Sequence, residues 1–154
     1  MKRIAIFPGS FDPFTKGHEN IVQRAIPLFD EIVIGLGVNN KKQYMFDTES
    51  RIKHIQSLFP NQNVVVEAYT GLTVDFCKEK KAGYLLRGLR NTNDFEFEKA
   101  IGQMNKDLNG IETVFLITDK EFGAVSSTII REIKINGGDV SQFVTNLNFL
   151  IINK

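Results

Sequence analysis

The regular alternation of short apolar runs with longer amphipathic segments constrains the fold of this chain most. Five runs rich in β-branched residues are mostly apolar, without clean alternation of polar positions: 3–7, 31–38, 63–68, 84–87 and 112–117. Continuous apolar runs of this length are typical of strands buried on both faces of a parallel sheet. We therefore expect five parallel strands connected by helices.

Helical patterns occupy the intervening segments. The expected helices are 17–29, a segment from a cap at Asp47 or Thr48 to Leu58, a segment from a cap at Thr70 to before Gly83, 93–108, 127–135 capped by Ser126, and a final one from Ser141 onward. Parallel strands require right-handed crossover helices. The sequence therefore predicts an α/β fold, a Rossmann-like doubly wound five-stranded parallel sheet with helices on both faces.

Composition narrows the functional classes. A length of 154 residues with 42% apolar and 24% charged residues predicts a single globular domain over 1–154. The formal net charge of +1 argues against a nucleic-acid partner. A single cysteine, Cys77, cannot form an internal disulfide, and with only His18 and His54 beside it the chain cannot assemble a structural zinc site. We expect Cys77 to pack internally and His54 to be a surface or half-buried residue. No apolar run approaches the roughly 20 residues of a membrane helix, so we expect a soluble, cytoplasmic protein without a membrane partner.

The turn after the first run carries the strongest functional signal. Residues 7–18 connect a strand to a helix, where free N–H groups and the helix dipole attract anions. Gly9 allows close approach of a ligand, Ser10 offers a hydroxyl, and His18 lies in the first helical turn. The spacing matches neither a dinucleotide loop nor a Walker A loop. From these residues alone, an ordinary strand-to-helix turn remains an alternative.

Three further segments follow predicted strands. The loop 38–46 contains Lys42 and is either a solvated basic loop or an anion contact. Arg87 and Arg90 flank Gly88-Leu89, where guanidinium groups suit phosphate oxygens, although surface ion pairs with Asp94, Glu96 and Glu98 would also explain them. Residues 122–128 lead into a helix, and an N-cap role explains Ser126 fully.

These strings resemble the nucleotidyltransferase superfamily. Gly9–Pro13 and Thr15–His18 are similar to its Gly-(Ser/Thr)-Phe-Asp-Pro and (His/Thr)-x-Gly-His halves. Residues 87–98 resemble the signature of the phosphopantetheine adenylyltransferase branch, and the likeness spans Lys2 to about Phe143. The sequence departs from the family pattern at three places. Asn40 stands where proline is usual, Phe97 where tyrosine is common, and Phe122-Gly123 where Trp or Tyr followed by Ser is often found.

The resemblance implies transfer of AMP from ATP to 4′-phosphopantetheine, giving dephospho-coenzyme A and pyrophosphate. It implies catalytic roles for His18, Ser10, Lys42 and Arg90. The implied ATP-binding residues are Ser10, Phe11, His18, Gly88, Leu89, Arg90, Glu98, Phe122, Gly123, Ala124, Val125, Ser126, Ser127 and Thr128. The implied acceptor-binding residues are Ser10, Lys42, Thr73 and Arg87.

No protein metal ligands are expected, and Mg²⁺ is expected to arrive with ATP. The resemblance also implies a homohexamer, with the apolar tail 149–152 compatible with some burial between subunits. Two other possibilities are a nucleotidyltransferase that uses nicotinamide mononucleotide or CTP, and a catalytically inactive nucleotide sensor. The Arg-Gly-Leu-Arg segment argues against the first, and the presence of His18, Lys42 and Arg90 argues against the second.

Overall fold

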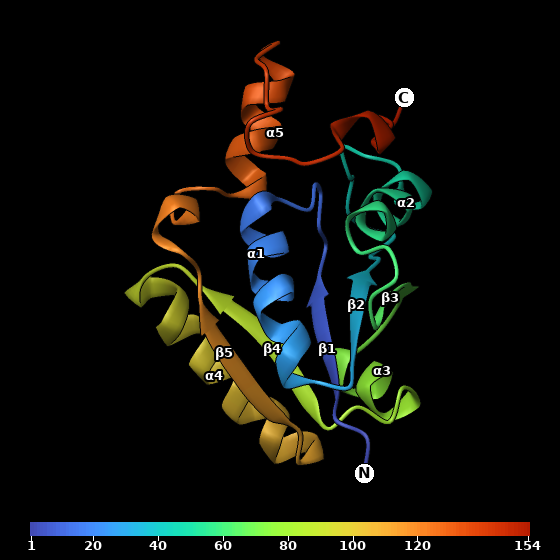
Figure 1. The fold of residues 1–154 in the computed structure, drawn as a ribbon, viewed down its shortest axis with the longest axis vertical. Helices are drawn as coiled ribbons and strands as arrows, with labels where there is room; N and C mark the ends of the chain where they lie inside the picture. The colour runs from blue at the N-terminus through green and yellow to red at the C-terminus, as the bar shows by residue number, and fades with distance from the viewer.

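The computed structural model describes residues 1–154 and contains one five-stranded, all-parallel sheet (Figure 1). The strand order is β3-β2-β1-β4-β5. The strands are β1 (Ile4–Gly9), β2 (Glu31–Gly37), β3 (Val64–Tyr69), β4 (Tyr84–Leu89) and β5 (Glu112–Ile117). The strand order reverses between β1 and β4, as in doubly wound sheets. The predicted fold class and all five strands are confirmed, with bounds within two residues.

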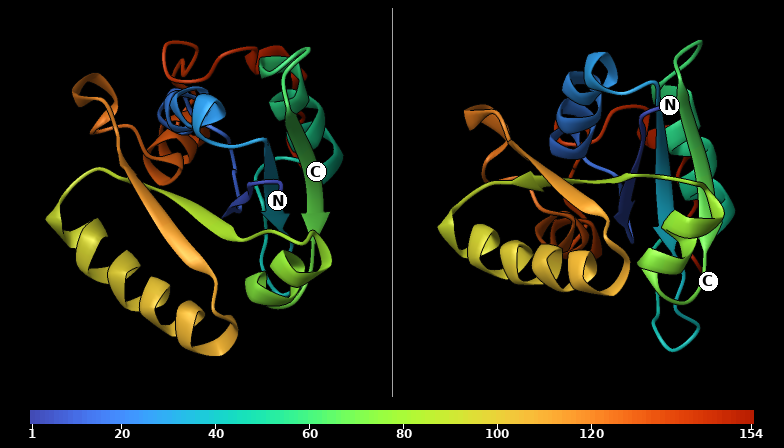
Figure 2. Two further views of the ribbon diagram at one scale, coloured as in Figure 1. Left: turned by 60° about the horizontal axis from the view of Figure 1, so that its bottom comes forward. Right: turned by 90° about the horizontal axis from the view of Figure 1, so that it is seen from below.

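Helices cover both faces of the sheet, as Figure 2 shows for α1 and α4. The α-helices are α1 (Lys16–Ala25), α2 (Thr48–Leu58), α3 (Thr73–Glu79), α4 (Thr92–Asn109) and α5 (Ser127–Ile135), and short 3₁₀ turns span Ile26–Leu28, Lys120–Phe122 and Leu147–Phe149. The larger apolar core joins α1 and α2 to β1 and β2, whereas a smaller one joins α3 to the opposite face. The turns after β1 and β4 therefore open at the same edge, beside the reversal of strand order.

Two predicted helix starts are confirmed and one is wrong. Asp47 caps α2, and Ser126 caps α5, each by accepting a backbone N–H. The predicted cap at Thr70 is wrong because α3 starts three residues later, at Thr73 after Leu72. Gly71 lies between them with φ +84, which interrupts the helical path.

The predicted helix from Ser141 onward is also wrong. The segment 139–154 contains turns and the short 3₁₀ helix Leu147–Phe149, and Figure 1 shows it crossing from α5 to α2. Its end pairs with the loop after β2: Asn153 N–H donates to the Met45 carbonyl at 2.8 Å, and Asp47 N–H donates to Ile151 at 2.8 Å. This pairing supplies hydrogen bonds that a helix would otherwise provide.

The prediction for His54 is wrong, whereas the prediction for Cys77 is confirmed. Both side chains have 0% exposure. His54 lies under the C-terminal segment, where its Nε2 bonds to the Thr145 carbonyl at 2.6 Å. Cys77 packs in the smaller core, and burial raises the pKa of its thiol to about 11. None of the helices combines the length and apolar character needed to span a membrane.

Candidate active site

Two adjoining pockets open at the carboxyl-end edge of the sheet. The first has a volume of about 330 Å³ and lies between β1, β4, α1 and the start of α5, and the second, of about 360 Å³, lies between β1, β3, the start of α3 and α4. They share Ser10, Arg87 and Glu98 in their walls, together with Pro8 and Gly9. A ligand in either pocket would therefore be close to a ligand in the other.

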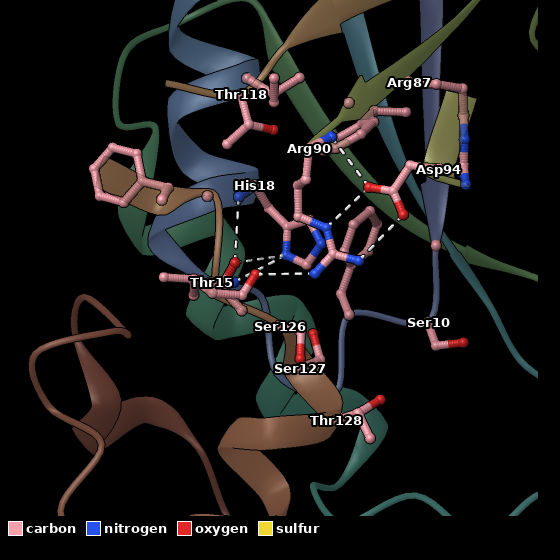
Figure 3. A pocket seen from close by; sticks show the side chains of 18 of the residues that line it. Ser10, Thr15, His18, Arg87, Arg90, Asp94, Thr118, Ser126, Ser127 and Thr128 are labelled. Carbon is pink, nitrogen blue, oxygen red and sulfur yellow. Dashed lines mark hydrogen bonds and ion pairs between the residues drawn. The ribbon is translucent and has the colours of Figure 1, made fainter. Parts of the chain in front are cut away.

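The first pocket brings together most of the residues singled out from the sequence (Figure 3). Those in its wall are Ser10, Phe11, His18, Arg87, Gly88, Arg90, Glu98, Phe122, Val125, Ser126, Ser127 and Thr128. Thr73 lines the second pocket instead. Leu89, Gly123 and Ala124 line neither pocket although they are next to residues that do, and Lys42 is exposed on the loop after β2, outside both walls.

His18 is fixed by the cap of its own helix. The Thr15 hydroxyl accepts the His18 N–H at 3.3 Å, and His18 Nδ1 accepts the Thr15 N–H at 3.0 Å. Histidine thus takes the place that Glu or Gln has in a capping box. Because Nδ1 is an acceptor, the proton of the neutral imidazole is on Nε2. The ring packs edge-on against Phe11, with centroids 5.1 Å apart.

Burial strongly favours the neutral form of this ring. Burial, together with the positive charges of Arg87 and Arg90, lowers the pKa of His18 from 6.5 to about 3. At neutral pH, His18 is therefore a hydrogen-bond donor without a charge. A neutral donor in the wall of this pocket can stabilise developing negative charge by a hydrogen bond, but it carries no additional proton with which to act as a general acid.

This shifted pKa predicts a pH dependence of stability. Between pH 6.5 and about 3, the unfolded chain binds a proton at His18 that the folded chain does not. The free energy of unfolding should therefore fall as the pH drops below 6.5, by up to about 1.4 kcal/mol per pH unit from this group. Urea unfolding from pH 4 to 8 would measure the slope. His18→Gln retains the capping-box pattern and should show a shallower slope, and equal slopes would contradict the assignment.

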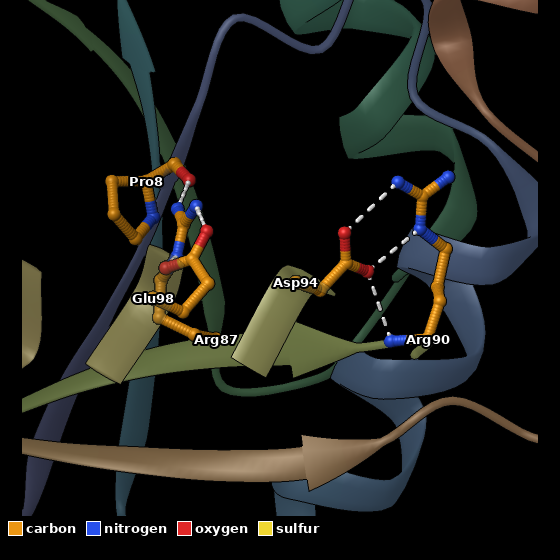
Figure 4. A network of polar contacts seen from close by, with 5 residues as sticks. All are labelled: Pro8, Arg87, Arg90, Asp94 and Glu98. Atoms are coloured by element: carbon orange, nitrogen blue, oxygen red, sulfur yellow. Dashed lines mark hydrogen bonds and ion pairs between the residues drawn. The ribbon is translucent and has the colours of Figure 1, made fainter. Parts of the chain in front are cut away.

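Two arginine–carboxylate pairs line the pocket walls (Figure 4). Arg87 donates Nε to Glu98 at 2.7 Å and Nη1 to the Pro8 carbonyl at 2.7 Å, and its Nη2 also bonds to Glu98. Arg90 donates Nε to Asp94 at 3.0 Å. Although burial alone would raise the pKa of Asp94, its bonds to Arg90 hold that pKa below the usual range.

The alternative explanation of Arg87 and Arg90, that they form surface ion pairs, is correct about the pairing but not about its place. Asp94 and Glu98 pair with Arg90 and Arg87, but these pairs stand in the pocket walls and Glu96 takes no part in them. A guanidinium fixed by a carboxylate keeps the remaining donors in a defined direction.

The first turn of α5 closes the other side of the first pocket. Ser126 caps the helix by accepting the Ile129 N–H at 3.2 Å, and Ser127 donates to the Pro13 carbonyl at 2.8 Å. Arg131 also lines the pocket and donates to the Asp12 carbonyl at 2.8 Å. Arg131 was not predicted as a site residue, although its position one helical turn after Ser127 places it on the same face.

Asp94 and Thr118 were also missed as wall residues. Asp94 was considered only as an ion-pair partner, and its spacing of four residues from Arg90 was the available signal. Thr118 comes directly after β5, at the edge where the other site residues lie.

Comparisons with known proteins identify the family. The family model for cytidylyltransferase-like proteins matches residues 6–133. A phosphopantetheine adenylyltransferase of Flavobacterium psychrophilum is 53% identical over 143 residues, covering 92% of this chain and 95% of the relative. Another, from Christiangramia forsetii, is 48% identical over 144 residues, covering 93% of this chain and 95% of the relative.

Solved structures support the fold. Nicotinic acid mononucleotide adenylyltransferase of Plasmodium falciparum, complexed with NaAD, superposes with a TM-score of 0.71 at 16% identity, covering 97% of this chain and 93% of that one. At this identity, the likeness shows the fold alone. The sequence relatives, at about half identity over nearly the whole length, are more specific, and by them the chain belongs to the phosphopantetheine adenylyltransferase family of the nucleotidyltransferase superfamily.

Proposed function

We propose that this enzyme transfers AMP from ATP to 4′-phosphopantetheine and releases dephospho-coenzyme A and pyrophosphate. The observation that carries the proposal is the pair of adjoining pockets that meet at Ser10 and Arg87, with His18 on the nucleotide side. The relatives' shared name supplies the substrate pair. The structural likeness to a nicotinic acid mononucleotide adenylyltransferase does not favour that acceptor, because it concerns the fold only.

The reaction is a direct displacement. A phosphate oxygen of the acceptor attacks the α-phosphorus of ATP, and the bond from that phosphorus to the bridging oxygen of pyrophosphate breaks. The acceptor phosphate is already ionised near neutral pH, so no general base is needed. Negative charge that builds up on the α-phosphoryl oxygens and on pyrophosphate is stabilised by His18 Nε2–H, free backbone N–H groups and nearby cations.

The proposed roles follow from the walls of the pockets. The nucleotide would lie in the first pocket, with its phosphates near Arg90 and the first turn of α5, where Thr128 offers a hydroxyl group and Ser127 is held by the Pro13 carbonyl. The acceptor would lie in the second pocket, with its phosphate near Arg87 and its arm beside Thr73. Lys42 would need to approach from its exposed loop, by a change in the path of that loop on binding.

Magnesium would enter as part of the nucleotide substrate. Asp94 and Glu98 are engaged by arginines, and the chain holds no group of three or more potential metal-ligating side chains of the His, Cys, Asp and Glu types. A site without such a group fits an Mg²⁺ ion that is held mainly by phosphate oxygens and water, which is the usual way in which Mg²⁺ is bound. When bound, the ion would neutralise part of the phosphate charge.

We also propose a cytoplasmic homohexamer. Support for assembly comes from an exposed apolar stripe on α4, at helical spacing, in which Phe97 and Met104 stand beside two residues of the second pocket wall, Ile101 and Leu108. An exposed stripe of this kind is typical of a surface that another subunit covers.

Charge within this stripe should therefore weaken assembly. We expect light scattering to give a mass about six times the 17.4 kDa of the chain, and Met104→Glu to give smaller species because it buries a carboxylate between subunits. Lys99→Glu changes charge on the same helix outside the stripe and is the control. A stable monomer for the unmodified chain at micromolar concentration would contradict the assembly.

The reaction itself is tested by pyrophosphate release. The assay contains ATP and Mg²⁺ with 4′-phosphopantetheine, nicotinamide mononucleotide or no acceptor, and CTP replaces ATP in a parallel set. Release only with ATP and 4′-phosphopantetheine is the expected result. Preference for nicotinamide mononucleotide or CTP would replace the proposed substrates, and nucleotide binding without release would favour the inactive sensor.

A further inference from the structure

Arg51 is a completely buried cation that belongs to neither pocket wall. Its side chain, on the first turns of α2, has 0% exposure and is among the largest fully buried side chains of the protein. Burying a guanidinium is costly unless its donors are satisfied. A leucine or methionine at this position of the core would avoid that cost, so the charge and the donor geometry of Arg51 require an explanation.

Apart from one bond to its own helix, its contacts lead to the two loops that approach the site. Arg51 Nη1 donates to the Ser10 carbonyl, and Nε donates to the Phe46 carbonyl at 3.1 Å. Nη2 donates to the Thr48 hydroxyl at 3.0 Å, and the guanidinium carbon lies 4.3 Å from the centre of the Tyr44 ring. One planar fork thus joins the turn after β1 to the loop after β2, which carries Lys42.

Asp12 joins the same two loops through complementary groups. Its carboxylate accepts the Met45 N–H at 2.8 Å and the Phe46 N–H at 2.9 Å, and the side chain is 4% exposed. Arg51 therefore binds carbonyl oxygens of both loops, whereas Asp12, in the first loop, binds N–H groups of the second. Together they fix the relative position of two backbone segments that secondary structure does not hold.

The contact with Ser10 has a direct consequence for the site. In a trans peptide unit, the C=O and N–H groups point in opposite directions. Arg51 draws the Ser10 carbonyl inward, so the N–H of Phe11 is directed away from Arg51. That N–H donates to no other group of the chain, and Phe11 has φ 47, a conformation that a non-glycine residue needs support to keep.

Taken together, these contacts lead us to infer that Arg51 is a positioning residue for adenylyl transfer. It holds the Ser10–Phe11 peptide so that the Phe11 N–H and the Ser10 hydroxyl face the phosphoryl group at the junction of the two pockets. The inference rests on the proposed function for the identity of the reaction. Arg51 acts through the backbone of Ser10 and contacts neither substrate.

Arg51→Lys tests the inference, because lysine keeps the charge but cannot reach three acceptors in one plane. We expect kcat to fall about 10- to 100-fold, since a small misplacement of catalytic groups costs this much, with the KM for ATP changed much less. Ile55→Val is the matched control: it removes one methylene from the buried face of the same helix, and its side chain makes no hydrogen bond to either loop. Its kcat should stay close to that of the parent protein.

A second measurement does not depend on turnover. Titration with ATP should shift the Phe11 amide signal in ¹H–¹⁵N spectra of the parent protein and Ile55→Val, and the shift should be at least halved in Arg51→Lys. If Arg51→Lys fails to fold, Thr48→Val removes one anchor of the guanidinium and should lower kcat and the amide shift in the same direction. Parent-like kcat and amide shift in a folded Arg51→Lys or Thr48→Val variant would overturn the inference. If the Phe11 amide shifts follow this expectation but the parent protein does not turn over 4′-phosphopantetheine, the proposed acceptor would be rejected and the role of Arg51 would stand.

Discussion

Replacing His18 with alanine is expected to lower kcat by about 10²- to 10³-fold, the usual cost of removing one donor to a developing oxyanion. The affinity for ATP should change far less, because the Nε2–H contributes mainly where charge accumulates in the transition state. Steady-state kinetics of pyrophosphate release, with ATP binding measured separately by calorimetry, would distinguish the two quantities. Near-normal turnover of His18→Ala would refute the assigned role.

The control for this experiment is His18→Gln. At position 18, the side chain needs an acceptor atom for the Thr15 N–H and a second atom, directed away from Thr15, that donates to the substrate. Glutamine offers both and is a standard residue at this position of a capping box. We expect His18→Gln to retain more activity than His18→Ala while remaining as stable near neutral pH. Equal losses in both variants would mean that the imidazole acts through something other than its donor.

Replacing Arg87 with methionine is expected to raise the KM for 4′-phosphopantetheine by about 10- to 100-fold. A hydrogen bond to a charged group contributes about 1.5–3 kcal/mol, which corresponds to this range. Arg87 stands in the wall common to both pockets, and Glu98 and the Pro8 carbonyl fix its guanidinium. The KM for ATP should rise much less if Arg87 binds the acceptor phosphate.

Arg3→Met is the matched control for Arg87→Met. Arg3 also donates to a carboxylate, that of Asp30, but this pair is exposed and outside both pockets. Its loss should leave both KM values unchanged. Equal increases of the two KM values in Arg87→Met would assign the arginine to the shape of the wall rather than to the acceptor.

The fold could be predicted because its main determinants are local. Buried parallel strands produce continuous apolar runs, and the capping side chains of Asp47 and Ser126 mark helix starts within a few residues. The doubly wound arrangement then follows from general rules for crossover connections. Motif strings at the strand ends indicated most of the first pocket for the same reason, since the carboxyl ends of parallel strands meet at one edge.

One error is local, and the other two involve partners far away in sequence. Thr70 has the right chemistry for a cap, but Gly71 turns the chain before the helix begins. His54 appears mid-helix in the sequence, and only the return of the C-terminal segment to Thr145 buries it. The terminal segment forms no long helix because its N–H and C=O groups bond to Met45, Asp47 and other distant residues. Contacts of this kind have no signature in a local window of residues.

The pairing of the last residues with the loop after β2 also bears on the order of folding. Met45 and Asn153 are separated by most of the chain, and contacts of such long sequence separation form late because loop closure must precede them. The sheet can assemble from neighbouring β-α units earlier. The loop 38–46 is therefore expected to reach its final path only when the rest of the domain has folded. Catalytic activity would then appear after the core has formed, and not together with it.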